Sequence, residues 1–239
     1  MTKNPHHDQR TGRTARILRI GHRGAPYAAP ANTMASFRAA HAAGCDWVEC
    51  DCRAAADGCI VLSHDEAVTD RSGEVYRVDQ TPSDELAALD LGASEGVATL
   101  EELVAWAANR VGIMADVKAS GCEKAIGETL SPIRSAHKIV PGADDEGRRR
   151  FRALFPDLPL SLSVSAGDED ELHRRWNTID TEAVTLQHPL VTAERVADLR
   201  RRNIRVYAWT VDDLETMRAL ADLGVDGLIS NRADRLANL

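Results

Sequence analysis

The chain has 239 residues, of which 44% are hydrophobic, enough for a large core and too many for a disordered protein. Its formal net charge of −8 argues against a protein that coats DNA or RNA, because such proteins neutralise phosphates with excess cations. With no apolar run near the roughly 20 residues of a membrane span, no secretory signal and an odd number of cysteines, we expect a reduced, cytoplasmic protein.

Residues 1–15 lack a hydrophobic period and are predicted to be a flexible tail before a single domain over 16–239. From there short β-like runs alternate with amphipathic helical patterns. The predicted strands are 17–21, 45–52, 112–118, 137–140, 160–164, 183–187, 204–210 and 225–229. The predicted helices are 33–43, 100–109, 123–136, 144–155, 169–177, 192–202 and 212–223. This alternation predicts a closed (β/α)8 TIM barrel, with an open doubly wound sheet as the alternative.

A hairpin is predicted after the second strand. The run 59–64 follows that strand after only a few residues, whereas a parallel connection needs about a dozen or more. We therefore expect 45–53 and 59–64 to pair antiparallel around the turn residues Asp57-Gly58. This turn brings His64 back roughly opposite Asp51.

The segment 66–98 is longer than a barrel loop requires and is predicted to form a small insertion. It contains turn residues and a short helical pattern over 83–89. Ser83 is predicted to be the N-cap of this helix, because a serine hydroxyl can accept a hydrogen bond from the first turn.

Acidic side chains stand near the carboxyl ends of two predicted strands. Glu49 and Asp51 are two residues apart and share one face of their strand, and Asp116 comes from the next parallel strand. At the active-site end of a barrel, three carboxylates repel one another unless a cation neutralises them. Oxygen ligands favour Mg²⁺ or Ca²⁺, so we predict a divalent metal site. The alternative is that Glu49 and Asp51 face solvent or pair with arginine.

Two histidines lie at the ends of neighbouring strands. His22 and His64 can act as general acid and general base across one scissile bond. Arg23 adds a planar donor for a phosphate, and Lys118 adds a positive charge on the inward face of Asp116. This set suits a phosphodiester, whose charge lies on non-bridging oxygens. The sequence leaves open which histidine is the acid.

Several motifs occur in a fixed order along the chain. They are His22-Arg23-Gly24, Pro30-Ala31-Asn32-Thr33, Ser36-Phe37, Glu49-x-Asp51, Asp57-Gly58, His64-Asp65, Thr99-Leu100-Glu101-Glu102, Ala115-Asp116-Val117-Lys118, Trp209-Thr210-Val211-Asp212 and Gly224-Val225-Asp226-Gly227. Together they resemble the glycerophosphodiester phosphodiesterase (GDPD) family, over about residues 16–235.

The resemblance implies a (β/α)8 barrel of lipid metabolism that hydrolyses glycerophosphodiesters, with a divalent metal, to glycerol 3-phosphate and an alcohol. The implied roles are metal binding by Glu49, Asp51 and Asp116, acid–base catalysis by His22 and His64, phosphate binding by Arg23 and Lys118, and an apolar wall for the alcohol by Trp209. Two alternatives remain: a lyase or transferase that forms a cyclic phosphate or phosphonate ester, and a non-catalytic phosphodiester-binding barrel. The expected partner is a small molecule. The choice between Mg²⁺ and Ca²⁺, the alcohol group and the oligomeric state stay open.

The chain departs from the family pattern at several positions. Ala31 stands where the family has Glu, and Asp116 replaces another Glu, which shortens one metal-binding arm by a methylene group. Asp212 replaces an Asn, and Ser230-Asn231 replaces Thr-Asp. Pro141-Gly142 stands where the family has a Ser-Ser-Phe strand end, which predicts an altered substrate pocket.

Overall fold

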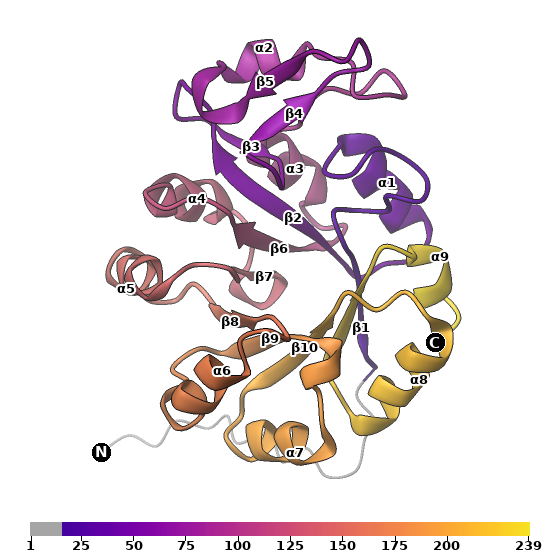
Figure 1. The fold of residues 1–239 in the computed structure, drawn as a ribbon, viewed down its shortest axis with the longest axis vertical. Helices are drawn as coiled ribbons and strands as arrows, with labels where there is room; N and C mark the ends of the chain where they lie inside the picture. Colours follow the sequence, from indigo (N-terminus) through magenta and orange to yellow (C-terminus); the bar gives the residue numbers. More distant parts are fainter. Residues whose placement is uncertain (1–15) are drawn as a thin grey trace.

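The computed structural model describes residues 16–239, and the predicted tail, 1–15, lies outside the described residues. Within this range eight parallel strands form a nearly closed ring, surrounded by helices (Figure 1). The strands are β1 (Leu18–Gly21), β2 (Trp47–Ala54), β6 (Gly112–Val117), β7 (Lys138–Ile139), β8 (Ser161–Val164), β9 (Ala183–Gln187), β10 (Arg205–Trp209) and β11 (Gly227–Ser230). Their order is β7-β6-β2-β1-β11-β10-β9-β8, which confirms the predicted (β/α)8 TIM barrel.

The ring closes between β7 and β8. Val140 and Leu160, which flank these strands, form a parallel bridge. The backbone N–H of Val140 donates to the carbonyl of Pro159 at 3.0 Å, and that of Ser161 donates to the carbonyl of Val140 at 3.0 Å. The predicted alternative of an open doubly wound sheet, in which these edge strands would lie apart, is therefore excluded.

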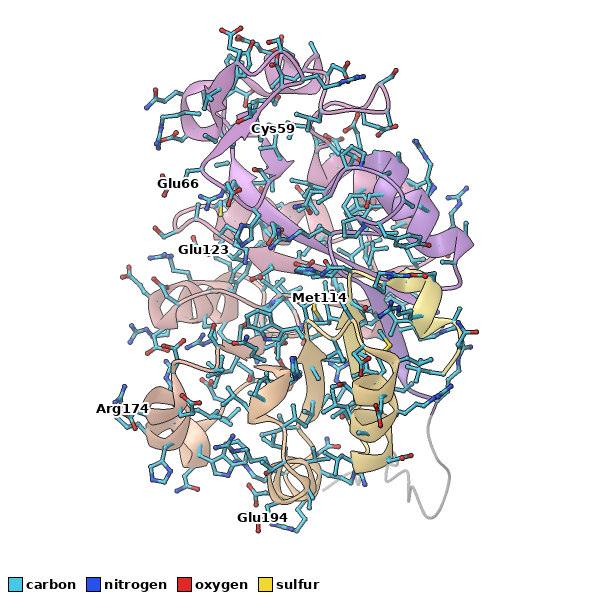
Figure 2. All side chains as sticks on the ribbon, turned by 45° about the vertical axis from the view of Figure 1, so that its right-hand side comes forward. Cys59, Glu66, Met114, Glu123, Arg174 and Glu194 are labelled. Carbon is cyan, nitrogen blue, oxygen red and sulfur yellow. The ribbon has the colours of Figure 1, made fainter. Side chains whose placement is uncertain are left out.

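Successive strand residues point alternately into the barrel and out toward the helices. Trp47, Met114 and Tyr207 pack inside the barrel, and Figure 2 shows Met114 in the middle of the molecule. Cys50 and Cys52 point the other way and pack in the larger apolar layer beneath the helices. Glu49 and Asp51 share the inward parity of Trp47, which is what positions them for a site in the barrel mouth.

The helices cover the outside of the ring (Figure 1). They are α1 (Met34–Ala42), α3 (Leu100–Ala107), α4 (Glu123–Leu130), α5 (Asp145–Leu154), α6 (Glu169–Arg175), α7 (Ala193–Arg201), α8 (Leu214–Leu223) and α9 (Ala233–Leu236). Short 3₁₀ turns are η1 (Val78–Gln80), η2 (Ser135–His137), η3 (Trp176–Thr178) and η4 (His188–Leu190). Within the described range no helix combines the length and the apolar character needed to cross a bilayer.

Local chemistry explains where α3 begins and where α4 ends. Thr99 and Glu102 form a capping box at the start of α3: the N–H of Glu102 donates to Thr99 Oγ1 at 3.1 Å, and the N–H of Thr99 donates to Glu102 Oε2 at 2.8 Å. The prediction that a helix continues from 123 to 136 is wrong, because α4 ends at Leu130. Pro132 follows, and proline lacks the N–H that a further helical turn needs.

The predicted hairpin is confirmed. Strand β3 (Ile60–Leu62) pairs antiparallel with β2, and Gly58 takes a φ of +82° in the turn between them. The register differs by one residue from the prediction. The N–H of Ser63 donates to the carbonyl of Asp51 at 2.9 Å, so Ser63 lies opposite Asp51 and His64 follows one residue beyond.

The segment after β3 forms a small lobe at the top of Figure 1. It contains the two-stranded sheet of β4 (Ala67–Thr69) and β5 (Val75–Arg77), followed by α2 (Ser83–Ala87). The prediction that Ser83 caps this helix is wrong, because the N-cap is Pro82. Both the N–H and the hydroxyl of Ser83 instead donate to Asp57 Oδ2, at 3.1 and 2.7 Å. A carboxylate from the β2–β3 turn therefore accepts the backbone N–H at the start of α2, which has no acceptor within the helix.

Candidate active site

The predicted site residues gather where the inward faces of several strands reach the barrel mouth. His22 and Arg23 follow β1, Glu49 and Asp51 lie in β2, His64 follows β3, Asp116 lies in β6 with Lys118 just after it, and Trp209 ends β10. The neighbouring strands β2 and β6 pair in register, with Asp51 beside Asp116. The sheet thus brings together residues that are far apart in the chain.

Glu49, Asp51 and Asp116 form one group, called here the carboxylate cluster. One oxygen from each residue lies within 4.8 Å of the others. Glu49 and Asp51 are only 3% and 1% exposed, so water cannot screen their charges. The three-carboxylate arrangement expected from the spacing is therefore present.

Two cationic side chains face the carboxylate cluster. Arg23 Nε lies 3.0 Å from Asp51 Oδ2, and the backbone N–H of Arg23 donates to Glu49 Oε2 at 2.8 Å. Lys118 Nζ donates to Asp116 Oδ2 at 2.7 Å and lies 3.2 Å from Asp51 Oδ1. The alternative in which these carboxylates pair with arginine is thus realised for Asp51. The carboxylate cluster thus has three acidic groups and two cationic neighbours.

Burial and neighbouring charges shift the pKa values of the groups in and around the carboxylate cluster. Burial, reinforced by Asp51 and Asp116, raises the pKa of Glu49 well above its usual value. Burial also raises the pKa of Asp116, although Lys118 and, more weakly, His64 act in the opposite direction. Burial alone would lower the pKa of Lys118, but Asp116 and Asp51 raise it. The folded protein therefore disfavours the ionised forms of Glu49 and Asp116.

The donor set of the cluster suits a divalent cation. Asp116 Oδ1 is buried and accepts no hydrogen bond from any described residue, whereas the buried Asp51 Oδ1 has the Lys118 ammonium 3.2 Å away. A buried acceptor without a donor is costly, and a metal ion is one way to satisfy it. Carboxylate oxygens without sulfur or imidazole are typical of Mg²⁺ and Ca²⁺ sites.

The loop after β7 covers the Asp116 carboxylate. The N–H of Val117 donates to the carbonyl of Pro141 at 3.2 Å, which holds the loop against β6. Gly142 takes a φ of +79°, and a Cβ at this position would lie 1.8 Å from Asp116 Oδ1. Only glycine fits this approach. Asp116 and the Pro141-Gly142 loop, which both depart from the family pattern, therefore pack directly against each other.

Asn32 is a site residue for which the sequence analysis assigned no role. Its Nδ2 donates to Asp51 Oδ2 at 2.8 Å, and its Oδ1 accepts from the N–H of Asp51 at 3.2 Å. Asn32 has a φ of +60°, a conformation that asparagine tolerates better than most residues. The sequence feature that could have identified Asn32 as a site residue was its place in the motif Pro30-Ala31-Asn32-Thr33. The two hydrogen bonds fix Asp51 from the β1–α1 loop.

His22 lies beside the carboxylate cluster, with its Nε2 atom 3.9 Å from Glu49 Oε2. Its Nδ1 atom is hydrogen-bonded to Asn231 Oδ1 at 2.7 Å. Burial lowers the pKa of His22, although the hydrogen bond to Asn231 raises it. The net shift favours the neutral imidazole, the form in which a histidine can accept a proton.

His64 is the more exposed histidine, with 43% of its side chain accessible. Its Nδ1 atom lies 2.8 Å from Asp65 Oδ1, and the guanidinium of Arg53 donates twice to its backbone carbonyl, at 3.0 and 2.9 Å. No direct contact joins His64 to the carboxylate cluster among the described residues, but its charge acts on Asp116. The two histidines thus stand in different environments.

Trp209 lies two strands from β1 on the ring. Its indole N–H donates to the carbonyl of Thr185 at 3.2 Å, and its ring packs against the apolar interior of the barrel. The side chain is partly buried. Its predicted role in binding the alcohol stays a prediction.

The fold and the site together define a class of protein. The chain matches the Glycerophosphoryl diester phosphodiesterase family over residues 22–235. It belongs to this family and is a phosphoric diester hydrolase.

Individual relatives agree with this assignment. The chain is 29% identical, over 239 residues, to the probable glycerophosphodiester phosphodiesterase 2 of Mycobacterium tuberculosis, covering 93% of this chain and 90% of that protein. It is 28% identical, over 243 residues, to a glycerophosphodiester phosphodiesterase of Caldanaerobacter subterraneus, covering 94% and 98%. An Oleispira antarctica phosphodiesterase, solved with the product sn-glycerol-3-phosphate, superposes with a TM-score of 0.81 at 24% identity, covering 92% and 95%. This last likeness shows the shared fold.

Proposed function

We propose that this enzyme hydrolyses a glycerophosphodiester to a phosphomonoester and an alcohol, using a divalent cation and the His22–His64 pair. The observation that carries the proposal is the carboxylate cluster, with its oxygens within 4.8 Å of one another and His22 Nε2 at 3.9 Å from Glu49. The names of the curated relatives and the glycerol 3-phosphate bound to the Oleispira antarctica protein support the substrate class.

Glu49, Asp51 and Asp116 would hold the cation, either Mg²⁺ or Ca²⁺. The close approach of the three carboxylates supports this assignment, as does Asp116 Oδ1, which is buried and accepts no hydrogen bond from any described residue. When bound, a divalent cation polarises a non-bridging phosphate oxygen and neutralises the charge that develops there.

The remaining side chains have complementary tasks. Arg23 and Lys118 bind the phosphate oxygens with a guanidinium fork and a compact ammonium. His22 and His64 exchange protons with the nucleophile and the leaving oxygen, one as base and the other as acid. Trp209 bounds the pocket on the apolar side of the alcohol. His22 and Arg23 both follow β1, and the other groups stand at or just beyond the ends of β3, β6 and β10, so the fold fixes their spacing.

We also propose a cytoplasmic location. All five cysteines lie in the described part of the chain and are free thiols, four of them buried. Free thiols are the state that a reducing compartment maintains. Fractionation of cells followed by detection of the full-length protein tests the location, and recovery from an exported fraction would contradict it.

The activity is tested by ³¹P NMR with a panel of glycerophosphodiesters in ¹⁸O-labelled water, with Mg²⁺, Ca²⁺ or chelator. We expect a cation-dependent phosphomonoester that carries the label. His22→Ala and His64→Ala should each lower turnover by roughly 10²–10⁴. His137→Ala is the matched control, because His137 is exposed and lies in η2, outside the barrel mouth.

Other products would point elsewhere. An unlabelled cyclic phosphate that accumulates would favour the lyase or transferase alternative. Tight binding of a glycerophosphodiester without turnover under either cation would favour the binding barrel. Full activity in both histidine variants would remove His22 and His64 from the mechanism.

A further inference from the structure

A polar network lies behind His22, on the side away from the carboxylate cluster. It consists of Asp212, just after β10, and Asn231, just after β11. Asn231 Nδ2 donates to Asp212 Oδ2 at 2.8 Å, and Asn231 Oδ1 lies 2.7 Å from His22 Nδ1. Three strand ends that are far apart in the chain therefore meet in one chain of hydrogen bonds.

The chemistry of Asp212 fixes the direction of this chain. An ionised carboxylate only accepts hydrogen bonds, so the amide of Asn231 must turn its NH₂ group toward Asp212. The amide oxygen then faces His22, and an oxygen can only accept. His22 must therefore carry its proton on Nδ1. The other ring nitrogen, Nε2, keeps its lone pair and faces the barrel mouth, 3.9 Å from Glu49 Oε2.

Asp212 is itself held in place from several sides. Its Oδ1 accepts from the Ser230 hydroxyl at 2.9 Å and from the backbone N–H of Asn231 at 2.8 Å. Its backbone carbonyl accepts from Arg235 at 2.6 Å. Rotation of the carboxylate would break these bonds and leave polar groups unpaired at a partly buried site. The residues at the end of β11 thus fix which group donates and which accepts in each hydrogen bond of the network.

We infer that Asp212 and Asn231 are positioning residues that select the Nδ1–H tautomer of His22 and hold Nε2 unprotonated toward the substrate. This inference rests on the proposed function, in which His22 transfers a proton. Neither residue is among the partners of the carboxylate cluster in the described structure, so both act through the imidazole. His64 has a simpler arrangement, in which the carboxylate of the next residue, Asp65, meets its Nδ1 directly.

The tautomer is measured by NMR of the full-length protein labelled with ¹⁵N-histidine, with the His22 signals assigned by their loss in His22→Gln. In the wild type at neutral pH we expect a protonated Nδ1 and an unprotonated Nε2. Asp212→Asn removes the obligatory acceptor, so the Asn231 amide can turn over and the Nε2–H tautomer should appear. An Asp→Asn change behind a catalytic histidine lowers kcat by about 10⁴ in serine proteases, and we expect a loss of about 10²–10⁴ here.

A reciprocal exchange separates positioning from mere structural support. In the double variant Asp212→Asn with Asn231→Asp, the new amide at 212 can accept from Ser230 and donate to the carboxylate at 231, which accepts from His22 Nδ1. The Ser230 hydroxyl, the amide at 212 and His22 Nδ1 then each donate to an acceptor. We expect the Nδ1–H tautomer to return and kcat to recover to within about tenfold of the wild type, which is about 1.4 kcal/mol. Asp213→Asn is the control, because this carboxylate caps α8 by accepting from Thr216.

The outcomes distinguish this inference from the proposed function. A protonated Nε2 in the wild type, or an unchanged tautomer in a folded Asp212→Asn variant, would overturn the inference while His22→Ala still tests the function. Failure of the double variant to restore either tautomer or kcat would also overturn it. If Asp212→Asn does not fold, Asn231→Ala, which deletes the acceptor, must yield a mixture of both tautomers. Full activity in His22→Ala would remove the proposed function but leave the tautomer result standing.

Discussion

At the scale of single residues, the site depends on close fits that leave no room for an added methyl group. Gly142 lies so close to Asp116 that a Cβ would reach 1.8 Å from its Oδ1 atom. Gly24 is similar: with a φ of +85°, its Cβ would meet the backbone of Ser36 at 2.6 Å and that of Phe37 at 2.8 Å. These contacts explain why the loops that carry His22 and that cover Asp116 contain glycine.

Gly142→Ala should push the Asp116 carboxylate out of the cluster. We expect weaker binding of Mg²⁺ or Ca²⁺ by calorimetry and a loss of about 10²-fold in kcat/KM, because a catalytic group displaced by about 1 Å has effects of this size. Gly73→Ala is the matched control. Its φ of +91° imposes the same kind of backbone strain, but its Cβ would meet nothing within 4 Å. Equal effects in the two variants would contradict the role of the Asp116 contact.

At the scale of elements, helices are stabilised by acceptors from near and distant parts of the chain. The capping box of Thr99 and Glu102 is local and starts α3. The start of α2 uses Asp57, which is 26 residues away in the chain. Sequence patterns find the first kind of cap but not the second, because the distant acceptor arrives only when β2 and β3 have paired. This is why the prediction for Ser83 was wrong.

Thr99→Ala should destabilise the protein by about 0.5–2 kcal/mol, because it removes the hydroxyl that caps α3. Urea denaturation measures the change in the free energy of unfolding. Thr129→Ala is the control: Thr129 lies inside α4, where its hydroxyl donates to the Ala125 carbonyl and alanine is the better helix former. A destabilisation as large in Thr129→Ala would speak against the capping role.

An ion pair between Glu123 and Arg150 ties α4 to α5, with the two atoms 2.7 Å apart. Burial alone would raise the pKa of Glu123, but the hydrogen bonds from Arg150 and from backbone N–H groups outweigh it, and the pKa lies below its usual value. The folded state therefore favours the ionised form. The resulting stabilisation is complete above the unfolded pKa of about 4.3 and disappears as the pH falls through the folded value.

Glu123→Gln should therefore be less stable than the wild type at pH 7, and the difference should shrink as the pH falls below about 4. Thermal unfolding across this pH range measures it. Glu128→Gln is the control in the same helix, where the carboxylate is exposed and, among residues 16–239, pairs with Lys124 alone, at 3.8 Å. A difference between Glu123→Gln and wild type that stays constant with pH would contradict the ionic contribution.

At the scale of the whole molecule, the period-2 pattern of β2 was enough to predict which side chains face the barrel mouth. It predicted that Glu49 and Asp51 share one face of the strand, and the chain order of strands and helices predicted the ring. The partners of His22 could not be predicted in this way. Asn231 is 209 residues away, and its amide meets the imidazole only because β1 and β11 become neighbours on the ring.

The central claim is that Glu49, Asp51 and Asp116 together hold a divalent cation at the barrel mouth. Calorimetric titration of Mg²⁺ and of Ca²⁺ into chelator-treated protein tests it most directly, with Asp51→Asn as the test variant and the exposed Asp157→Asn as the control. The account predicts saturable binding of at least one cation to the wild type and to Asp157→Asn, and its loss in Asp51→Asn. Absence of binding in the wild type, or equal affinity in all three proteins, would contradict it.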